Sequence, residues 1–324
     1  MSIFTPIQQF ADLVSYDWLS LSRDSHIGQG LNFFILDVIK IGILLLVINY
    51  FMAIVRYYLP VNKIRNILTS RKWYGLDYLL AALFGVITPF CSCSSIPLFI
   101  GFVASGIPLG VTFAFLITSP LVNESSLALF PALFGGKVTI AYNVIGVLIG
   151  VLGGVIIQKL KMDKYIEPSF LKFKSREEME VNNIHPTFFK RIKLWWTEGW
   201  GITKSLLPYV FLGIGVGALI HGFIPAGFFE RYLVNSQWWT VPVAVVIGVP
   251  LYANSISVIP VMESLLGKGI DIGTVFAFMT GVVTLSIPQF LILKKAMRMP
   301  LLLTFFGITT VGIIIMGYLF NIIF

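Results

Sequence analysis

Apolar residues run along this chain in stretches long enough to cross a membrane. A helix of about 20 residues spans the hydrocarbon core of a bilayer, and eight apolar stretches come near that length. They lie at residues 31–55, 73–90, 110–133, 138–158, 202–222, 239–252, 272–293 and 300–323. Two shorter apolar segments, 94–104 and 256–266, each follow a polar interruption, so we expect 73–104 and 239–266 to form hairpins or pairs of short helices. The pattern predicts an all-α polytopic membrane protein with five helical segments in each half.

The two polar interruptions are near-copies of one motif. The first is Pro89–Pro97 and the second is Pro250–Pro260, and the alignment that places Pro97 on Pro260 also places Gly110 on Gly273. Duplicated breaks of this kind are typical of transporters whose substrate site forms where two broken helices meet at mid-membrane. We therefore predict two repeats of inverted topology, 31–158 and 201–324. An N-terminal interfacial segment, 1–30, precedes them, and a cytoplasmic linker, 159–200, joins them.

Composition and charge agree with a membrane protein. Of the 324 residues 57% are hydrophobic and only 12% are charged, which leaves too little polar surface for a soluble domain of this length. The net charge of +8 does not indicate nucleic-acid binding, because no basic face with interleaved aromatic residues is present. Instead, eighteen of the 23 Lys and Arg residues fall in three regions, 56–72, 159–204 and 294–298.

Those three basic regions predict the orientation of the chain. Alternate threading of the segments puts all three on one side, which the positive-inside rule makes the cytoplasm. Both termini then lie outside. The first half begins outside and the second begins inside, so the two repeats have opposite orientation in the membrane.

The first interruption contains the only two cysteines, Cys91 and Cys93. Thiolates prefer soft acceptors such as Cu(I), Zn(II) or trivalent arsenic. A closed zinc site normally needs four Cys or His ligands, and the three histidines lie elsewhere in the chain, so a partly coordinated substrate in transit fits better. Two alternatives stay open: the cysteines pack as small apolar side chains in a tight helix break, or they form a strained redox pair.

Other polar residues in the predicted membrane segments extend this candidate site. An intramembrane glutamate is costly, which makes Glu124 a candidate for proton coupling; the alternative is a structural glutamate near a helix end. Thr284, Ser286 and Gln289 occupy the corresponding region of the second half and are neutral. The expected substrate-binding residues are Cys91, Cys93, Ser92, Ser94, Ser95, Asn123, Asn254, Ser255 and Ser257.

No motif for an enzyme or for an energy-coupling ATPase is visible. The nearest approach to a Walker A loop, around Lys137, lacks its first glycine and its hydroxyl residue. No Ser-His-Asp set, HExxH or GxSxG pattern is present, so we expect neither an enzyme nor a bound cofactor. The linker 159–200 leaves one further alternative, a membrane subunit that scaffolds partner proteins.

The stretch Thr88–Pro97, with its Pro-x-Cys-x-Cys core, continues through Gly110–Glu124 and resembles the YraQ/ArsP-like family of bacterial inner-membrane permeases. The resemblance covers nearly the whole chain in length and segment order. It implies a permease and, for the best-known branch, efflux of trivalent organoarsenicals such as methylarsenite through cysteine thiolates. The substrate-binding role carries over to Cys91 and Cys93 alone. Some arsenic-exporting members are expected to use a further cysteine, which this chain lacks, but methylarsenite needs only two thiolates.

Overall fold

The computed structural model describes residues 5–23, 25–58, 75–87, 92–104, 106–167, 237–251 and 255–324, together with single residues and short runs between 189 and 215. This part of the chain is helical, with one isolated antiparallel bridge between Ile166 and Met297. The prediction of an all-α membrane protein is confirmed. The loop 59–74 and most of the predicted linker and of the 202–222 span lie outside the described residues.

The N-terminal segment is anchored to the first long helix. Helix α1 (Thr5–Asp12) continues into a π-helical turn (Leu13–Trp18), and α2 (His26–Tyr58) follows. The Asp12 carboxylate accepts hydrogen bonds from Asn32 Nδ2 at 2.7 Å and from Gln8 Nε2 at 2.9 Å. Trp18 exposes 73% of its surface, as the predicted interfacial segment requires, although its placement on a bilayer stays a prediction.

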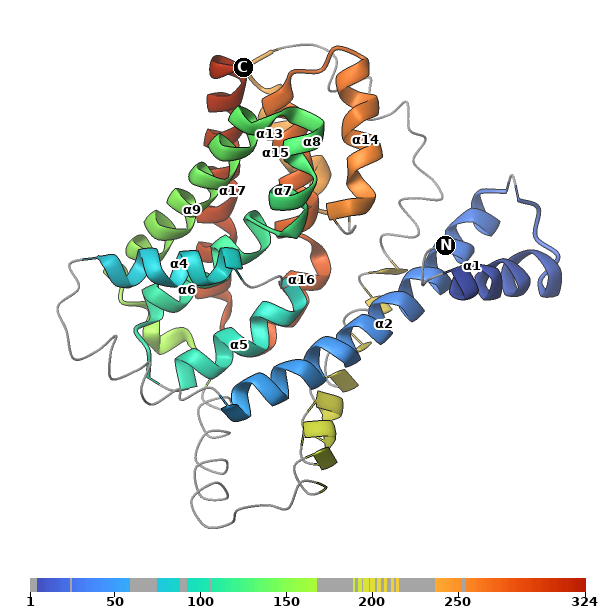
Figure 1. The fold of residues 1–324 in the computed structure, drawn as a ribbon, viewed down its shortest axis with the longest axis horizontal. Coiled ribbons are helices and arrows are strands. Elements are labelled where there is room, and N and C mark those ends of the chain that lie inside the picture. The colour runs from blue at the N-terminus through green and yellow to red at the C-terminus, as the bar shows by residue number, and fades with distance from the viewer. Residues whose placement is uncertain are drawn as a thin grey trace.

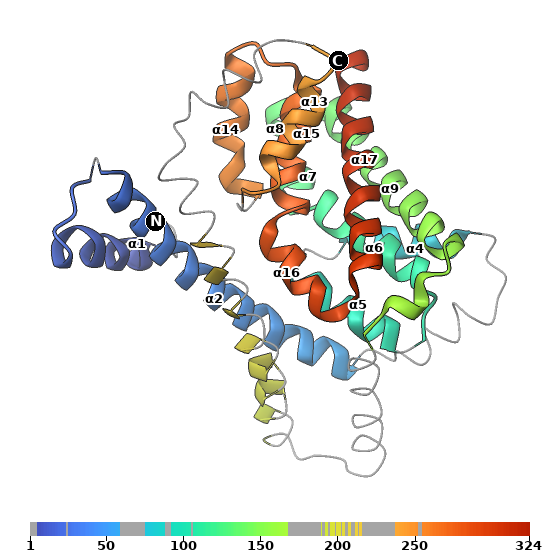
Figure 2. The same ribbon diagram turned by 180° about the vertical axis from the view of Figure 1, so that it is seen from behind.

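The remaining named helices fall into two sets, one from each half of the chain (Figure 1, Figure 2). The first half contains α4 (Leu76–Ile87), α5 (Ser92–Ala104), α6 (Leu109–Leu121), α7 (Glu124–Ala128), α8 (Phe130–Phe134) and α9 (Gly136–Lys159). A short 3-10 turn, Met162–Tyr165, follows α9. The described second half contains α13 (Thr240–Gly248), α14 (Ser255–Gly267), α15 (Ile272–Thr284), α16 (Ile287–Ala296) and α17 (Met299–Ile323).

Helix bounds and contacts recur between the halves in the alignment that places Gly110 on Gly273. Helices α14 and α15 begin and end at the positions that correspond to the ends of α5 and α6. In the first half α6 packs against α4, α5 and α9, and in the second half α15 packs against α13, α14 and α17. An equivalent hydrogen bond joins α6 to α9 and α15 to α17. Gly110 N donates to Gln158 Oε1 at 2.8 Å, and Gly273 N donates to Asn321 Oδ1 at 2.7 Å.

Glycines allow these helices to approach at backbone distance. A Cβ on Gly110 would lie 2.5 Å from the carbonyl oxygen of Gly154, and a Cβ on Gly273 would overlap the carbonyl oxygen of Gly317. Both obstacles are backbone atoms, which cannot rotate away. Close packing through small residues is a common way for helices to associate in a membrane, where lipid offers no hydrophobic drive for association.

We expect Gly110→Ala and Gly273→Ala each to destabilise the protein by about 1–3 kcal/mol, because the added methyl forces two helices apart. The matched control is Gly307→Ala in α17, where an added Cβ meets no atom within 4 Å. Thermal unfolding of the purified variants in detergent measures the difference. Equal unfolding temperatures for Gly110→Ala and Gly307→Ala would contradict the described helix contact.

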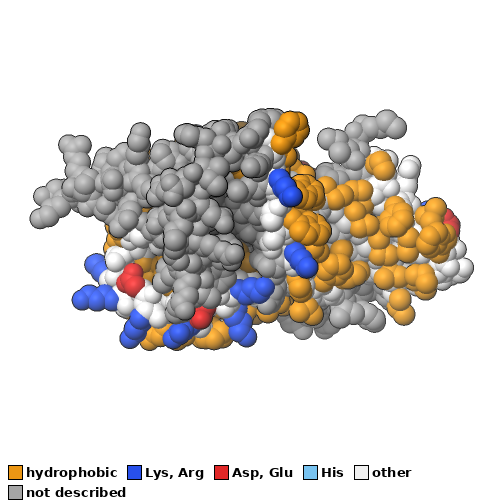
Figure 3. Space-filling view, turned by 90° about the horizontal axis from the view of Figure 1, so that it is seen from below, with side chains coloured by type: hydrophobic (Ala, Val, Ile, Leu, Met, Phe, Trp, Pro, Cys, Tyr) orange, Lys and Arg blue, Asp and Glu red, His pale blue; other side chains and the backbone are white. Residues whose placement is uncertain are grey.

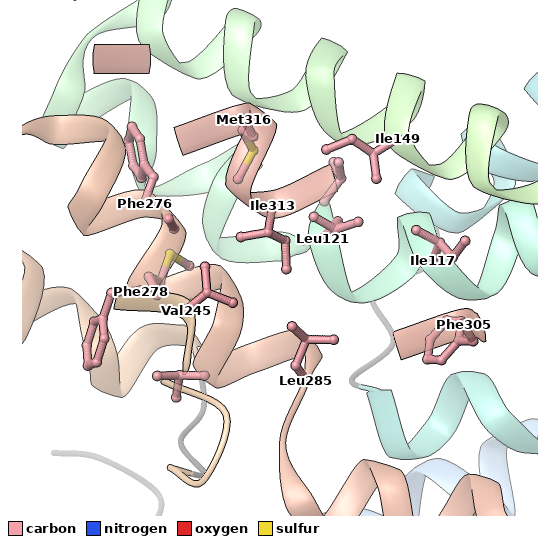
Figure 4. Packing of buried hydrophobic residues seen from close by; sticks show 14 of the residues in the cluster. Ile117, Leu121, Ile149, Val245, Phe276, Phe278, Leu285, Phe305, Ile313 and Met316 are labelled. Atoms are coloured by element: carbon pink, nitrogen blue, oxygen red, sulfur yellow. The ribbon is translucent and has the colours of Figure 1, made fainter. Parts of the chain in front are cut away.

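One apolar core joins the two halves. Phe130 of α8 stacks on Phe276 of α15, with ring centroids 5.4 Å apart, and Phe276 meets Phe320 of α17 edge-on at 5.1 Å. Helices α6 and α15 also pack against each other. Figure 4 shows buried side chains of both halves in a single cluster. Its labelled members are Ile117, Leu121, Ile149, Val245, Phe276, Phe278, Leu285, Phe305, Ile313 and Met316.

Two of the expected membrane spans are broken. The stretch 110–133 is divided after Leu121, and the stretch 272–293 is divided after Thr284, where the helix axis bends by 49°. Pro120 lies in the last turn of α6 and Pro288 in the first turn of α16; proline lacks the backbone N–H that a continuing helix needs. Among the described helices, α9 and α17 are each long and apolar enough to cross a membrane alone.

Two of the basic regions meet at one end of the molecule. Arg298 N donates to the carbonyl oxygen of Tyr165 at 2.7 Å, and Glu167 N donates to that of Ala296 at 3.1 Å. An exposed ion pair between Arg298 and Glu167, with Nε and Oε2 3.4 Å apart, adds little stability in water. In the view from below, Lys and Arg side chains gather beside a broad apolar face (Figure 3). The start of the linker and the 294–298 turn therefore lie at the same end of the molecule, and the side of the membrane that this end faces stays a prediction.

Candidate functional site

The cysteine break marks the start of a helix. Helix α4 ends at Ile87 and α5 begins at Ser92. Cys91 lies outside the described residues, whereas Ser92, Cys93 and Ser94 form the first turn of α5, with side chains outside the described part. The N-terminus of a helix carries a partial positive charge that favours a nearby anion, so the start of α5 suits a thiolate.

The second break has the same construction. Helix α13 ends at Gly248 and α14 begins at Ser255. Asn254 lies outside the described residues, and the side chains of Ser255 and Ser257 are outside the described part as well. In Figure 1 the Ser92 end of α5 and the Ser255 end of α14 both lie toward the middle of the molecule. The substrate-binding roles predicted for these residues stay predictions.

Ser95 holds α5 against α6. Its hydroxyl oxygen lies 2.7 Å from that of Ser119, and both side chains are fully buried. This contact aligns the helix that carries the cysteines with the helix that ends just before Asn123. Ser95 thus has a packing partner in addition to its predicted role in binding substrate.

The break after α6 is closed by its own polar residues. Asn123 is buried, and its Oδ1 accepts a hydrogen bond from Ser126 N at 3.1 Å. Ser126 Oγ lies 2.8 Å from both the Asn123 carbonyl oxygen and Asn143 Oδ1. Asn143, from α9, also donates to Ser126 O at 3.4 Å. The side chains of Asn123, Ser126 and Asn143 therefore form hydrogen bonds with backbone groups that the helix break would otherwise leave unpaired.

Glu124 is the first residue of α7, directly after this break. Its side chain is outside the described part, so its predicted role in proton coupling rests on its sequence and its backbone position. Tyr142 lies close by in the fold: its hydroxyl donates to Leu121 O at 3.0 Å and lies 3.1 Å from Thr280 Oγ1. The end of α6 is thereby tied to α15 of the other half.

The corresponding break of the second half is not closed in this way. Ser286 precedes α16 and makes no side-chain cap, and Gln289 lies in the first turn of that helix. Both are buried, at 0% and 1% exposure. Within the described structure neither Ser286 Oγ nor the Gln289 Nε2 and Oε1 atoms have a hydrogen-bond partner. The sequence placed these residues opposite Asn123 and Glu124 but gave no reason to assign them to the site.

Comparison with known proteins identifies the chain at the level of its family. Residues 26–322 match the model of the ArsP_1 family, whose members are described as predicted permeases. The chain belongs to this family. The match contains both polar breaks and both divided spans. A multi-pass membrane protein with a transporter role follows from this membership and from the apolar helices.

The chain is also similar in sequence to two proteins from different organisms. UPF0718 protein MJ0584 of Methanocaldococcus jannaschii is 21% identical over 90% of this chain and 98% of its own length. UPF0718 protein YraQ of Escherichia coli is 21% identical over 75% of this chain and 67% of its own length. No solved structure matches the chain.

Proposed function

We propose that this ArsP_1 permease exports a small, soft, thiol-reactive solute by secondary transport, with a trivalent organoarsenical such as methylarsenite as the model substrate. The observation that carries the proposal is the position of Cys93 in the first turn of α5, with Cys91 directly before that helix in the sequence, in a family of predicted permeases. Cys91 and Cys93 are the proposed ligands. Soft thiolates discriminate against the hard cations that are abundant in the cell.

The number of thiols suits methylarsenite. Its arsenic carries one methyl group and two hydroxyl groups, and two thiols replace both hydroxyls. Two As–O bonds break, two As–S bonds form, and the thiol protons leave with the hydroxyls as two water molecules. The exchange is reversible, which a transported substrate requires.

The proposed path lies between the two polar breaks. Ser92, Ser94, Ser95 and Asn123 would contribute from the first half, and Asn254, Ser255 and Ser257 from the second. The recurrence of helix bounds between the halves supports two repeats. The three basic regions, 56–72, 159–204 and 294–298, support an inverted orientation of the repeats in a bacterial inner membrane, with both termini outside. Glu124 would carry the coupling proton.

A second candidate keeps the permease and changes the cargo. Helix α5 uses a polar residue to pack against α6, through the hydrogen bond between Ser95 and Ser119, and the cysteines could serve α5 in the same manner. The protein would then carry another small solute. The scaffold alternative, through the linker 159–200, predicts no transport by the purified protein at all.

Reconstitution into liposomes separates these accounts. With an imposed proton gradient, we expect the purified protein to accumulate methylarsenite, whereas protein-free liposomes do not. Arsenite, Cu(I) and Zn(II) are tested in parallel, and the same four solutes are tested for resistance in an export-deficient bacterial host. Transport of a hard solute, with no transport of any of these four thiol-binding solutes, would favour the second candidate. A complete absence of transport would favour the scaffold.

A further inference from the structure

The two halves of the molecule treat equivalent polar positions differently. In the alignment that places Gly110 on Gly273, Ser286 corresponds to Asn123 and Gln289 to Ser126. In the first half Ser126 is paired with Asn143 of α9. The residue that corresponds to Asn143 is Phe306 of α17, which packs edge-on against Phe290 with ring centroids 5.2 Å apart.

This replacement leaves hydrogen-bonding capacity in the core of the second half. A glutamine side chain offers two donors and an acceptor, and a serine hydroxyl offers one donor and two acceptor lone pairs. Buried polar groups are almost always hydrogen-bonded, so an unpaired set needs a specific explanation. Because leaving them unpaired costs free energy, an apolar residue at position 289 would be the more stable choice unless something binds there.

The location of this unpaired set connects it with the cysteine break. Helix α16, which begins directly after Ser286, packs against α5 and α17. In Figures 1 and 2 the end of α5 that carries Ser92 lies beside α16. Gln289 thus lies on the helix that packs against α5, the helix that carries Cys93, and Ser286 directly precedes it.

The surroundings select a neutral ligand. Neither α5 nor α17 contains an acidic or basic residue, and the same holds for α6 and α15. The Lys294 and Lys295 side chains belong to the last turn of α16, at the opposite end from Gln289. A charged solute would find no counter-ion on these helices, whereas hydroxyl groups can both donate to and accept from an amide and a hydroxyl.

We propose that Ser286 and Gln289 form a hydrogen-bonding subsite for the hydroxyl groups of a small neutral solute, adjacent to the cysteine break. This inference rests on the proposed permease function, and it extends the site to two residues of the second half. The subsite holds the hydroxylated form of the substrate before the thiols replace its hydroxyls.

Boric acid tests the subsite independently of the thiols, because it is small, neutral and hydroxylated and has little affinity for thiolates. We expect it to raise the unfolding temperature of the purified full-length protein in detergent. The Cys91→Ser/Cys93→Ser double variant should respond equally. In Gln289→Met, which keeps the length of the side chain, and in Ser286→Ala, the apparent affinity for boric acid should fall about tenfold.

A second readout needs no ligand. Gln289→Met should raise the unfolding temperature by about 2–4 °C, since it removes an unpaired buried amide. The matched variant Ser126→Ala, at the equivalent paired position, should lower it, since it leaves Asn143 Oδ1 without its donor. A higher unfolding temperature for Gln289→Met and a lower one for Ser126→Ala is the result expected if Gln289 is kept for binding.

The outcomes distinguish this inference from the transport proposal. If boric acid does not raise the unfolding temperature of the wild-type protein, the subsite is wrong. The same holds if it raises the unfolding temperature of Gln289→Met equally, even where methylarsenite still binds through the cysteines. If boric acid binds in a Gln289-dependent manner but methylarsenite does not bind, the subsite stands and the thiol-reactive cargo is wrong. A lower unfolding temperature for Gln289→Met would show that buried water pairs the amide, which also overturns the inference.

Discussion

Replacing Cys91 and Cys93 together by serine is expected to reduce methylarsenite transport to the background of protein-free liposomes. Serine nearly preserves the volume of cysteine but is a poor ligand for a soft acceptor. Each single replacement should have the same effect, because one remaining thiol cannot replace both hydroxyls of the substrate. Alanine should act like serine, and all variants should insert and purify normally. Binding gives a direct measure: methylarsenite should bind at about one per chain and protect both cysteines from alkylation.

The packing alternative predicts the reverse pattern for the same variants. If the cysteines only fill space at the start of α5, their replacement should lower the unfolding temperature and the yield, while transport per folded molecule persists. Normalising transport to folded protein, measured by size-exclusion chromatography, separates the two. Resistance conferred by the double serine variant at wild-type expression would make another small solute the leading cargo.

Glu124→Gln is expected to abolish gradient-driven accumulation while substrate binding persists. The position opens α7 directly after the break at Asn123, and a glutamate in a membrane segment is costly unless it serves a function. Glutamine keeps the size and hydrogen-bonding capacity of the side chain and removes its proton chemistry. The two measurements are methylarsenite accumulation driven by an imposed proton gradient and methylarsenite binding to the same preparation.

Glu263→Gln is the matched control for this experiment, because Glu263 is an exposed glutamate of α14. It should leave both accumulation and binding unchanged. If Glu124→Gln transports with the pH dependence of wild-type protein, Glu124 is a structural residue of the break. Equal losses in both variants would point to a general effect of removing negative charge.

The hydrophobic pattern was sufficient to locate most helices. The expected spans 138–158 and 300–323 correspond to Gly136–Lys159 and Met299–Ile323, and the short segments 94–104 and 256–266 correspond closely to α5 and α14. Long apolar stretches that end at polar or glycine residues indicate where these helices begin and end. The breaks after Leu121 and Thr284 were missed, since apolar residues continue across both and hydropathy does not register a lost backbone hydrogen bond. Pro120 and Pro288 were the available signals.

The candidate site was less accessible to sequence reasoning. The internal repeat pairs Asn123 with Ser286, but the contact between Tyr142 and Thr280 joins distant parts of the chain that share no local pattern. The unpaired state of Gln289 is also invisible in a sequence. It depends on a third position, where the first half has Asn143 and the second has Phe306, and on which helices pack around it.

The aromatic contacts between the halves bear on how the permease would move. Separation of the two halves as rigid bodies would pull Phe130 from Phe276 and break the link from Tyr142 to Thr280, exposing a close-packed interior. The ring contacts of α5 in the described structure are with α4 and α6 of its own half, and α14 contains no aromatic residue. We therefore expect α8, α9, α15 and α17 to stay together as one unit while the permease alternates between its two access states.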